Sequence, residues 1–299
     1  METIKINVQK TETKKIQKIL LGTVAPRPIA LASTIDKNGN PNLSPFSFFN
    51  VFSANPPIAI FSPARRIRNN TIKHTLENIQ ETKEVVINIV TKEIIEQVSL
   101  SSSEYKKGIN EFQKSGLNQI NSELVKPFRV KESPVSFECK VKDIISLGES
   151  NGAGNLIICE IKIIHIDKKI LNKNGDIDRK KINLVGRLDG NWYSETNYNS
   201  LFEVIKPNKN PGIGVDKIPN NIKKSSILNG NDLGKLGNIE IIPNKKDISI
   251  FKNNNNKILK ILNSTTNDKK KIEELHRFAK KLLENNKINA AWKTLLIDK

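Results

Sequence analysis

Three neighbouring pieces of sequence decide the fold: Arg27-Pro-Ile-Ala-Leu-Ala-Ser-Thr34, Pro41-Asn-Leu-Ser-Pro-Phe-Ser-Phe-Phe-Asn50 and Asn55-Pro-Pro-Ile-Ala-Ile-Phe-Ser62. The first and last contain short apolar runs. Between the first two lies a polar turn with Gly39, a residue that tolerates positive φ. Short apolar runs joined by turns predict antiparallel strands. Two prolines precede the third run, where a missing N–H costs no ladder hydrogen bond.

The chain up to residue 205 continues this pattern. Val85–Val90 reads as a buried strand, and Val135–Lys142 alternates apolar and polar residues, as a half-buried strand does. A glycine-rich turn, Gly148–Asn155, joins it to the apolar segment Leu156–Ile166, so the two predict a hairpin. Thr75–Lys83 is the clearest helix here. Many short antiparallel strands with few helices favour a mainly β barrel or sandwich over a doubly wound sheet.

Near residue 206 the composition changes, and we expect two domains there, 1–205 and a C-terminal extension over 206–299. The extension opens with dense prolines and glycines, which predict irregular structure. Residues 268–285 then predict an amphipathic helix with Asp268 as its N-cap. Its apolar stripe is expected to dock on the parent domain or on a sister subunit.

The chain of 299 residues carries a formal net charge of +18, which taken alone favours nucleic acid as a partner. Lysine is abundant throughout, however, and no arginine-rich stripe alternates with aromatic residues, which make up 5% of the chain. A nucleic-acid module is therefore a minor alternative, and no nucleic-acid partner is expected. No apolar run reaches the roughly 20 residues of a membrane span, so we expect no membrane partner and a cytoplasmic location.

Several familiar motifs are missing from the sequence. It contains no Gly-x-Gly-x-x-Gly, no nucleotide-triphosphate loop, no His-Glu-x-x-His and no Gly-x-Ser-x-Gly. The three histidines, His74, His165 and His276, are too scattered for an obvious metal site, and none is predicted. Cys139 and Cys159 lie in strand-like apolar runs and are expected to be buried thiols.

A phosphate site is suggested by the basic segment before the predicted helix. Arg65, Arg66, Arg68 and Lys73 are followed by Thr75 at the helix start. Helix N-termini offer free N–H groups and the positive end of a dipole, and arginine and lysine add charge-assisted hydrogen bonds. The alternative is a solvated basic loop.

The serine- and phenylalanine-rich piece suits a flat ring with a polar tail. Ser44 and Ser47 can donate hydrogen bonds, whereas Phe46, Phe48 and Phe49 cannot all face one way, since strand side chains alternate. Taken alone, the cluster is also explained as core plus turn. Together with the basic segment it indicates a phosphorylated, ring-bearing cofactor such as flavin mononucleotide (FMN).

Two further sets of residues are each consistent with two interpretations. His165 shares strand parity with Cys159 and should point inward, which favours a histidine satisfied by a neighbour over a catalytic one. Arg187 and Trp192 are equally consistent with lining a site and with forming a subunit contact.

These motifs, taken in order, resemble a known family. Pro26–Ala30, the turn with Gly39, Asn42–Asn50, Asn55–Pro57 and Lys73–Asn78 are similar to the flavin reductase-like family with the FMN-binding split barrel, over roughly residues 16–205. The segments 211–216 and 230–237 resemble the tail of longer members. The family commonly has Lys-Asp-Thr where this chain has Lys73-His74-Thr75, and histidine is a poorer N-cap than aspartate.

The resemblance implies a six-stranded antiparallel Greek-key barrel with peripheral helices, a partly helical C-terminal extension, and a homodimer with FMN near the subunit interface. It implies that FMN is contacted by Arg27, Ser44, Phe46, Ser47, Phe48 and Asn50, and that its phosphate is held by Arg68, Lys73 and Thr75.

The implied reaction is hydride transfer from NADH or NADPH to bound FMN, in a cytoplasmic NAD(P)H:flavin reductase. The nicotinamide would stack on the flavin, so the missing dinucleotide motif does not argue against it. A downstream oxygenase or electron-acceptor protein is a possible partner. The alternative is an FMN-binding electron carrier fed by a partner protein, without direct NAD(P)H turnover.

Overall fold

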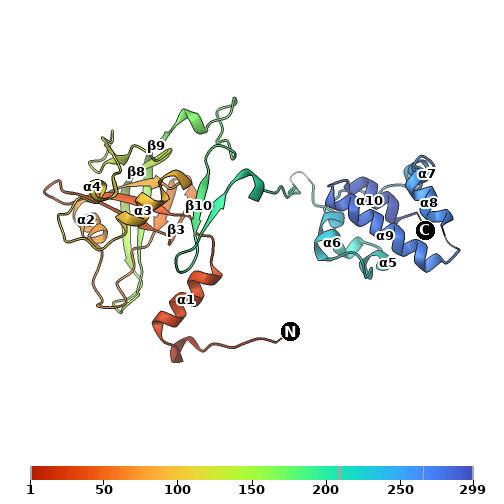
Figure 1. The fold of residues 1–299 in the computed structure, drawn as a ribbon, viewed down its shortest axis with the longest axis horizontal. Helices are drawn as coiled ribbons and strands as arrows, with labels where there is room; N and C mark the ends of the chain where they lie inside the picture. Colours follow the sequence, from red (N-terminus) through yellow and green to blue (C-terminus); the bar gives the residue numbers. More distant parts are fainter. Residues whose placement is uncertain (1, 208–209, 265, 298–299) are drawn as a thin grey trace. The chain divides into compact units, whose positions relative to one another are not determined.

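The computed structural model describes residues 2–207, 210–264 and 266–297. The chain divides into two compact units, Met1–Leu201 and Phe202–Lys299, and each is described here by itself (Figure 1). We name them the barrel unit and the helical unit. The division lies just before the domain boundary expected from the sequence. No helix among the described residues is long and apolar enough to cross a membrane.

One antiparallel sheet dominates the barrel unit. It contains seven strands in the order β2-β1-β5-β8-β9-β4-β3. The bounds of these strands are β1 (Ala30–Ile35), β2 (Pro41–Phe46), β3 (Phe49–Ala54), β4 (Pro57–Phe61), β5 (Glu84–Ile89), β8 (Val135–Ser146) and β9 (Asn155–Ile166). Two small ribbons pair β6 (Gln119–Ile120) with β7 (Arg129–Val130), and β10 (Leu184–Arg187) with β11 (Tyr193–Thr196). The predicted hairpin of long strands is the pair β8 and β9.

The sheet curls into a barrel around a single apolar core. Phe46 of β2 and Phe61 of β4 come from opposite sides of the strand order, yet their ring centroids are 5.3 Å apart. The same core contains both cysteines, Cys139 and Cys159, which are fully buried as predicted. Helix α2 (His74–Thr82) contributes Leu76 and Ile79 to this core. The helix matches the predicted segment to within a residue.

A second core lies on the other face of β1 and β2. It includes Leu31 and Leu43 from these strands and is covered by α3 (Ile95–Ser101) and α4 (Glu111–Ser115). Strand β1 is therefore buried along its whole length, which explains its continuous apolar sequence. Figure 1 shows α2, α3 and α4 beside the sheet; α1 (Thr13–Thr23) precedes β1 in the chain.

The helical unit contains six α-helices among its described residues: α5 (Asn220–Lys223), α6 (Gly230–Gly237), α7 (Lys245–Asn253), α8 (Asn256–Asn263), α9 (Asp268–Glu284) and α10 (Ile288–Leu295). Their core is apolar and has Trp292 at 0% exposure. Helix α9 is the predicted amphipathic helix, but its N-cap is Asn267, not Asp268. The Asn267 backbone is extended, and its side chain accepts a hydrogen bond from the backbone N–H of Lys270.

The apolar stripe of α9 has a different partner from the one expected. Leu275, Ala279 and Leu283 are buried, and Ala279 and Leu283 belong to the helical unit's own core. The expectation that this stripe docks on the barrel or a sister subunit was therefore wrong. The helices that follow the proline- and glycine-rich segment supply enough apolar surface to cover it within the same unit.

Candidate functional site

A narrow cavity in the barrel unit gathers most of the predicted phosphate residues. It lies where β2, the start of α2 and the end of α3 meet. We name it the basic corner, and its lining residues are Asn42, Ser44, Arg66, Lys73, His74, Thr75, Ser101, Ser103, Glu104, Tyr105 and Glu111. The structure thus brings Ser44, Lys73 and Thr75 together from segments that are some thirty residues apart in sequence.

Buried hydrogen bonds hold the walls of the basic corner in place. The side-chain amide of Asn42 donates to Thr75 Oγ1 at 2.9 Å and lies 3.2 Å from Thr34 Oγ1. The amide of Asn78 donates to the same Thr34 hydroxyl at 3.1 Å. These bonds tie β1, β2 and α2 to one another. Because Thr75 only accepts in this network, its own hydroxyl proton is available to a ligand.

The N-terminus of α2 has no side-chain cap. The N-cap residue is Lys73, whose backbone is extended and whose side chain makes no capping hydrogen bond. His74 is the first helical residue rather than the cap, which corrects the expectation from the family pattern. Burial, together with the cations Arg66, Lys107 and Lys73, lowers the pKa of His74, with Glu77 opposing. The neutral imidazole is favoured, so it does not oppose the helix dipole.

Two cations of the basic corner lack a good acceptor within the described chain. The side-chain nitrogen of Lys73 has neither a hydrogen bond nor an ion pair among the described residues. Burial lowers the pKa of Lys73, and the nearby Arg66 and Arg68 lower it further, while Glu111 opposes them. The Nε of Arg66 is buried without a hydrogen-bond partner. An orphaned buried donor costs about 1 to 3 kcal/mol, so the corner suits an anion that brings acceptor oxygens.

Two carboxylates share this corner with the cations. Glu111 is buried and accepts the backbone N–H of Leu43 at 3.1 Å, on the edge strand β2. Burial raises the pKa of Glu111, and the Leu43 hydrogen bond and Lys73 partly offset this. Glu104 pairs with Arg68, which is exposed and outside the lining of the cavity. Sequence reasoning missed both carboxylates, because no motif marks them and only the fold brings them to Lys73.

The predicted ring-contacting residues between Ser44 and Asn50 are spread over four places. Ser44 lines the basic corner, whereas Phe46 is 7% exposed and belongs to the barrel core. Ser47 lies in a second cavity, described below. Phe48 is 40% exposed, and Asn50 is exposed on β3, where its side chain accepts the N–H of Val51. Strand β2 ends at Phe46, and Ser47 and Phe48 lie in the bend that leads to β3.

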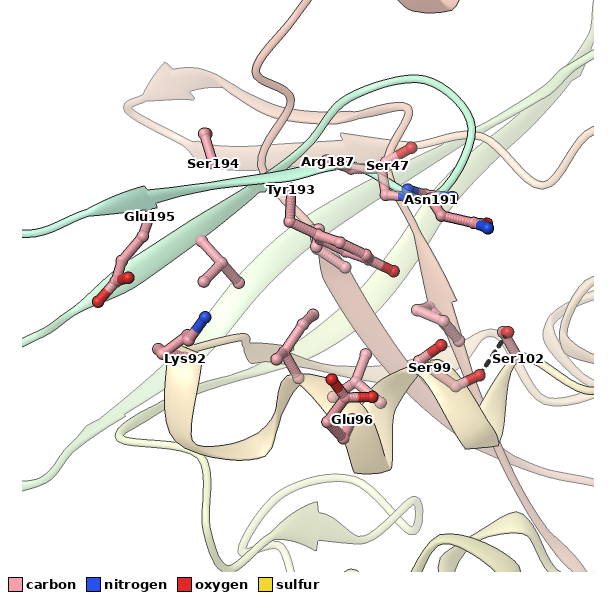
Figure 2. Close-up of a pocket in the computed structure, with 15 residues that line it drawn as sticks. Ser47, Lys92, Glu96, Ser99, Ser102, Arg187, Asn191, Tyr193, Ser194 and Glu195 are labelled. Atoms are coloured by element: carbon pink, nitrogen blue, oxygen red, sulfur yellow. Dashed lines mark hydrogen bonds between the residues drawn. The ribbon is translucent and has the colours of Figure 1, made fainter.

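The second cavity is a cleft of about 670 Å³ between α3 and the β10–β11 ribbon. We name it the α3 cleft. Its polar lining residues include Ser47, Lys92, Glu96, Ser99, Arg187 and Tyr193. Figure 2 shows α3 on one side and the ribbon on the other, with the Tyr193 ring reaching into the space between them. Strand β2 and helix α3 both line this cleft and the basic corner, so the two cavities follow the same pair of elements.

Arg187 lines the α3 cleft, which is one of the two positions expected for it. Its guanidinium stacks on Tyr193 at 4.5 Å from the ring centroid and donates to the carbonyls of Trp192 and Gly190. Trp192 is 74% exposed and is not among the lining residues. The arginine fixes the turn of the ribbon and so positions Tyr193.

Arg27 is 6% exposed and serves as a tie between segments. Its guanidinium donates to the carbonyls of Leu21, Val24 and Leu188, and its Nε lies 3.4 Å from Ser47 Oγ. Burial lowers the pKa of Arg27, as does the neighbouring Arg187, and Asp189 opposes them. Arg27 therefore anchors the end of α1 and reaches the α3 cleft only through Ser47.

His165 lies away from both cavities. Its Nε2 is 2.7 Å from Glu138 Oε1, and Glu138 is fully buried. The same carboxylate accepts the backbone N–H groups of Glu123 and Leu124 at 2.8 and 2.7 Å. Burial alone would raise the pKa of Glu138, but these donors lower it. The histidine is satisfied by a neighbour, as the sequence favoured, and the cluster pins a loop to β8.

No group of three His, Cys, Asp or Glu side chains suited to a metal ion occurs in the described parts of the chain.

Comparison with known proteins gives the family. The family model of the flavin reductase like domain matches residues 22–180, which include the lining of the basic corner and that of the α3 cleft except for the β10–β11 ribbon. An uncharacterised protein of Aquifex aeolicus is 38% identical over 186 residues, which are 62% of this chain and 92% of that protein.

Solved structures agree with this match. Nitrilotriacetate monooxygenase component B from Bacillus cereus is 27% identical, with a TM-score of 0.63 over 69% of this chain and 99% of its own. A Shewanella frigidimarina protein whose name gives a flavin reductase with a split barrel domain is 28% identical, with a TM-score of 0.58 over 69% of this chain and 99% of its own. The barrel of this protein is a split barrel with peripheral helices, and the chain belongs to the flavin reductase-like family.

Proposed function

We propose that this protein is an FMN-dependent oxidoreductase, an NAD(P)H:flavin reductase that passes hydride from NADH or NADPH to FMN. The observation that carries the choice of FMN is the basic corner. There, Lys73, which has no ion pair among the described residues, and the Nε of Arg66, which makes no hydrogen bond with them, lie beside the hydroxyls of Ser44 and Thr75. A terminal phosphate supplies the negative charge and the acceptor oxygens that this set of donors lacks.

The residues of the corner divide the work of holding a phosphate. Lys73 and Arg66 supply charge, and Thr75 and Ser44 supply hydroxyl donors. Arg68 adds charge from the rim. The uncapped N-terminus of α2 adds backbone N–H groups and the positive end of the helix dipole. This set includes all three phosphate residues expected from the family pattern, Arg68, Lys73 and Thr75.

The ring of FMN would lie along the edge strand β2, toward Ser47 and the α3 cleft. Among the described residues the outer edge of β2 pairs with no other strand of the sheet, and its N–H of Leu43 is bound by Glu111. We place Arg27, Phe48 and Asn50 around the ring in supporting positions, and Phe46 behind it in the core. A bound flavin supplies the redox chemistry by accepting a hydride and passing on electrons. The α3 cleft offers room for the nicotinamide, with Tyr193 and Lys92 as candidate contacts.

The test is a visible spectrum of the purified protein with FMN, followed without oxygen after addition of NADH or NADPH. We expect a bound-flavin spectrum that bleaches within seconds with at least one donor, because the donor can stack on the ring from the cleft. Bound flavin that stays yellow with both donors would favour the electron carrier fed by a partner protein. Failure to bind flavin would refute both functions.

We also propose that the protein works as a homodimer in the cytoplasm, where nicotinamide nucleotides are available as donors. Support comes from the second edge strand of the sheet, β3, which exposes Val51 and Phe52 at 54% and 64%. Exposed apolar side chains on an unpaired edge favour association with another chain. The mass of the protein in solution, measured by light scattering, tests this.

The physiological electron acceptor in this proposal is a downstream oxygenase. The similarity to nitrilotriacetate monooxygenase component B, a component of an oxygenase by its name, supports this choice. We assign the flavin chemistry to the domain of residues 1–205 and treat 206–299 as an appended extension.

A further inference from the structure

Glu104 connects the two arginines at the mouth of the basic corner. It follows α3, and its side chain lines the cavity and is 38% exposed. One carboxylate oxygen pairs with Arg68, and the other lies 3.2 Å from the Nε of Arg66. Each oxygen thus faces one arginine, which is also how two oxygens of a phosphate are commonly held.

The contact between Glu104 and Arg66 is incomplete. Although the two atoms are 3.2 Å apart, the buried Nε of Arg66 has no hydrogen-bond partner, so the approach supplies charge without hydrogen-bond geometry. Arg66 cannot turn to improve it, because its Nη1 is held by Thr71 Oγ1 at 2.8 Å and by the carbonyl of Ile72. A phosphate has several terminal oxygens and is not attached to this backbone, so one of its oxygens can accept a linear hydrogen bond from the fixed Nε of Arg66.

The charges of the basic corner also favour a phosphate there. Arg66, Arg68 and Lys73 are close enough that the two arginines lower the pKa of Lys73. Glu111 is held by the backbone N–H of Leu43 in the wall, whereas Glu104 is held only by the arginines among the described residues. Glu104 is therefore the carboxylate that can leave the corner for water at little cost.

We propose that Glu104 takes the place of the phosphate in the ligand-free protein and is displaced when FMN binds, so that it lowers the affinity for phosphate-bearing flavins. This inference rests on the proposed function, because it takes FMN as the ligand of the corner. The same contact keeps Arg66 and Arg68 from repelling each other in the free protein. Riboflavin, which has no phosphate, leaves Glu104 where it is.

The experiment measures dissociation constants of FMN and riboflavin, by quenching of flavin fluorescence, for the wild type and Glu104→Gln. The substitution keeps the shape of the side chain and removes its charge. We expect FMN to bind about 3- to 10-fold more tightly to the variant, the size expected for losing a competing, partly exposed ion pair. Riboflavin affinity should change less than about twofold. Unchanged or weaker FMN binding by the variant would overturn the inference, since Glu104 would then assist the ligand.

A matched control is Glu160→Gln. Glu160 is a carboxylate on β9 that pairs with Lys162 at 2.6 Å and does not line the corner. Its removal should leave the ratio of FMN to riboflavin affinity unchanged; a gain equal to that of Glu104→Gln would show a general charge effect and overturn the assignment to Glu104. A wild-type protein that binds neither flavin would instead refute the proposed function, and this inference with it. Thermal melts confirm that both variants are folded.

Discussion

The barrel unit and the helical unit differ in how their buried polar side chains are arranged. In the helical unit Asp232 completes the capping box of α6, Thr294 donates to a carbonyl one turn back, and His276 contacts Ser225 at 2.7 Å. In the barrel unit they converge from separate segments. Asn42, Thr75 and Glu111 meet at the basic corner, where the buried Nε of Arg66 lies 3.2 Å from Glu104 but makes no hydrogen bond with the described residues. Because burying polar groups costs free energy, such a convergence indicates a ligand site, whereas helix caps indicate only a stable fold.

The largest effect that separates the two units should come from Trp292→Ala. Trp292 is fully buried and donates to the carbonyl of Leu236 at 3.0 Å, so its loss leaves a cavity and an unpaired acceptor. We expect the helical unit to lose about 3 to 5 kcal/mol in its free energy of unfolding. Urea denaturation followed by helical circular dichroism measures this. FMN affinity should stay within about twofold, since the corner lies in the barrel unit.

Trp192→Ala is the matched control for that prediction. Trp192 belongs to the barrel unit and is 74% exposed, so its removal should cost less than about 0.5 kcal/mol. Each unit holds one of the two tryptophans, so each single-tryptophan protein reports the unfolding of one unit by fluorescence. A large loss of FMN affinity in Trp292→Ala would contradict this comparison of the two units, because it would show that the helical unit contributes to FMN binding.

Glu138→Ala should give the next largest effect. The variant leaves the backbone N–H groups of Glu123 and Leu124 and the ring of His165 without their acceptor. We expect a loss of about 2 to 4 kcal/mol in the stability of the barrel unit, measured by urea denaturation followed by the circular dichroism of its β-strands. Glu138→Gln, which keeps one acceptor oxygen, should lose less. If the alanine variant were as stable as the wild type, the hydrogen bonds that converge on Glu138 would not contribute to the free energy of unfolding.

Glu111→Gln should give the smallest effect, and it depends on pH. Burial raises the pKa of Glu111 above its usual value, so the folded protein holds a proton that the unfolded chain releases. The contribution of Glu111 to the free energy of unfolding is therefore fully present below the usual glutamate pKa, and it is lost as the pH rises through the folded pKa. The glutamine cannot ionise, so the variant should lack this fall and be slightly more stable at pH 7. Melting temperatures between pH 4 and 8 test the sign; a variant with the wild-type slope would contradict it.

Part of this arrangement could be predicted from the sequence. Alternating and apolar runs indicated the strands and the β8–β9 hairpin, and the motif from Lys73 to Asn78 placed α2. Two kinds of feature could not be read this way. Phe46 and Ser47 are adjacent in sequence, and their division between core and cleft depends on how the sheet curls. Glu104 and Glu111 follow no motif, since only tertiary contacts bring them to the corner. The sequence predicted helix α9 but not the surface on which it packs, because an apolar stripe does not determine which other apolar surface covers it.

The most direct measurement is a pair of titrations, with FMN and with riboflavin, on the wild type and Lys73→Ala. If the basic corner holds the phosphate, the variant should lose at least about tenfold in FMN affinity, the value of a charge-assisted contact. Riboflavin affinity should remain within about twofold, because riboflavin has no phosphate to lose. Equal losses for the two ligands, or no loss for either, would contradict the account and move the phosphate away from Lys73.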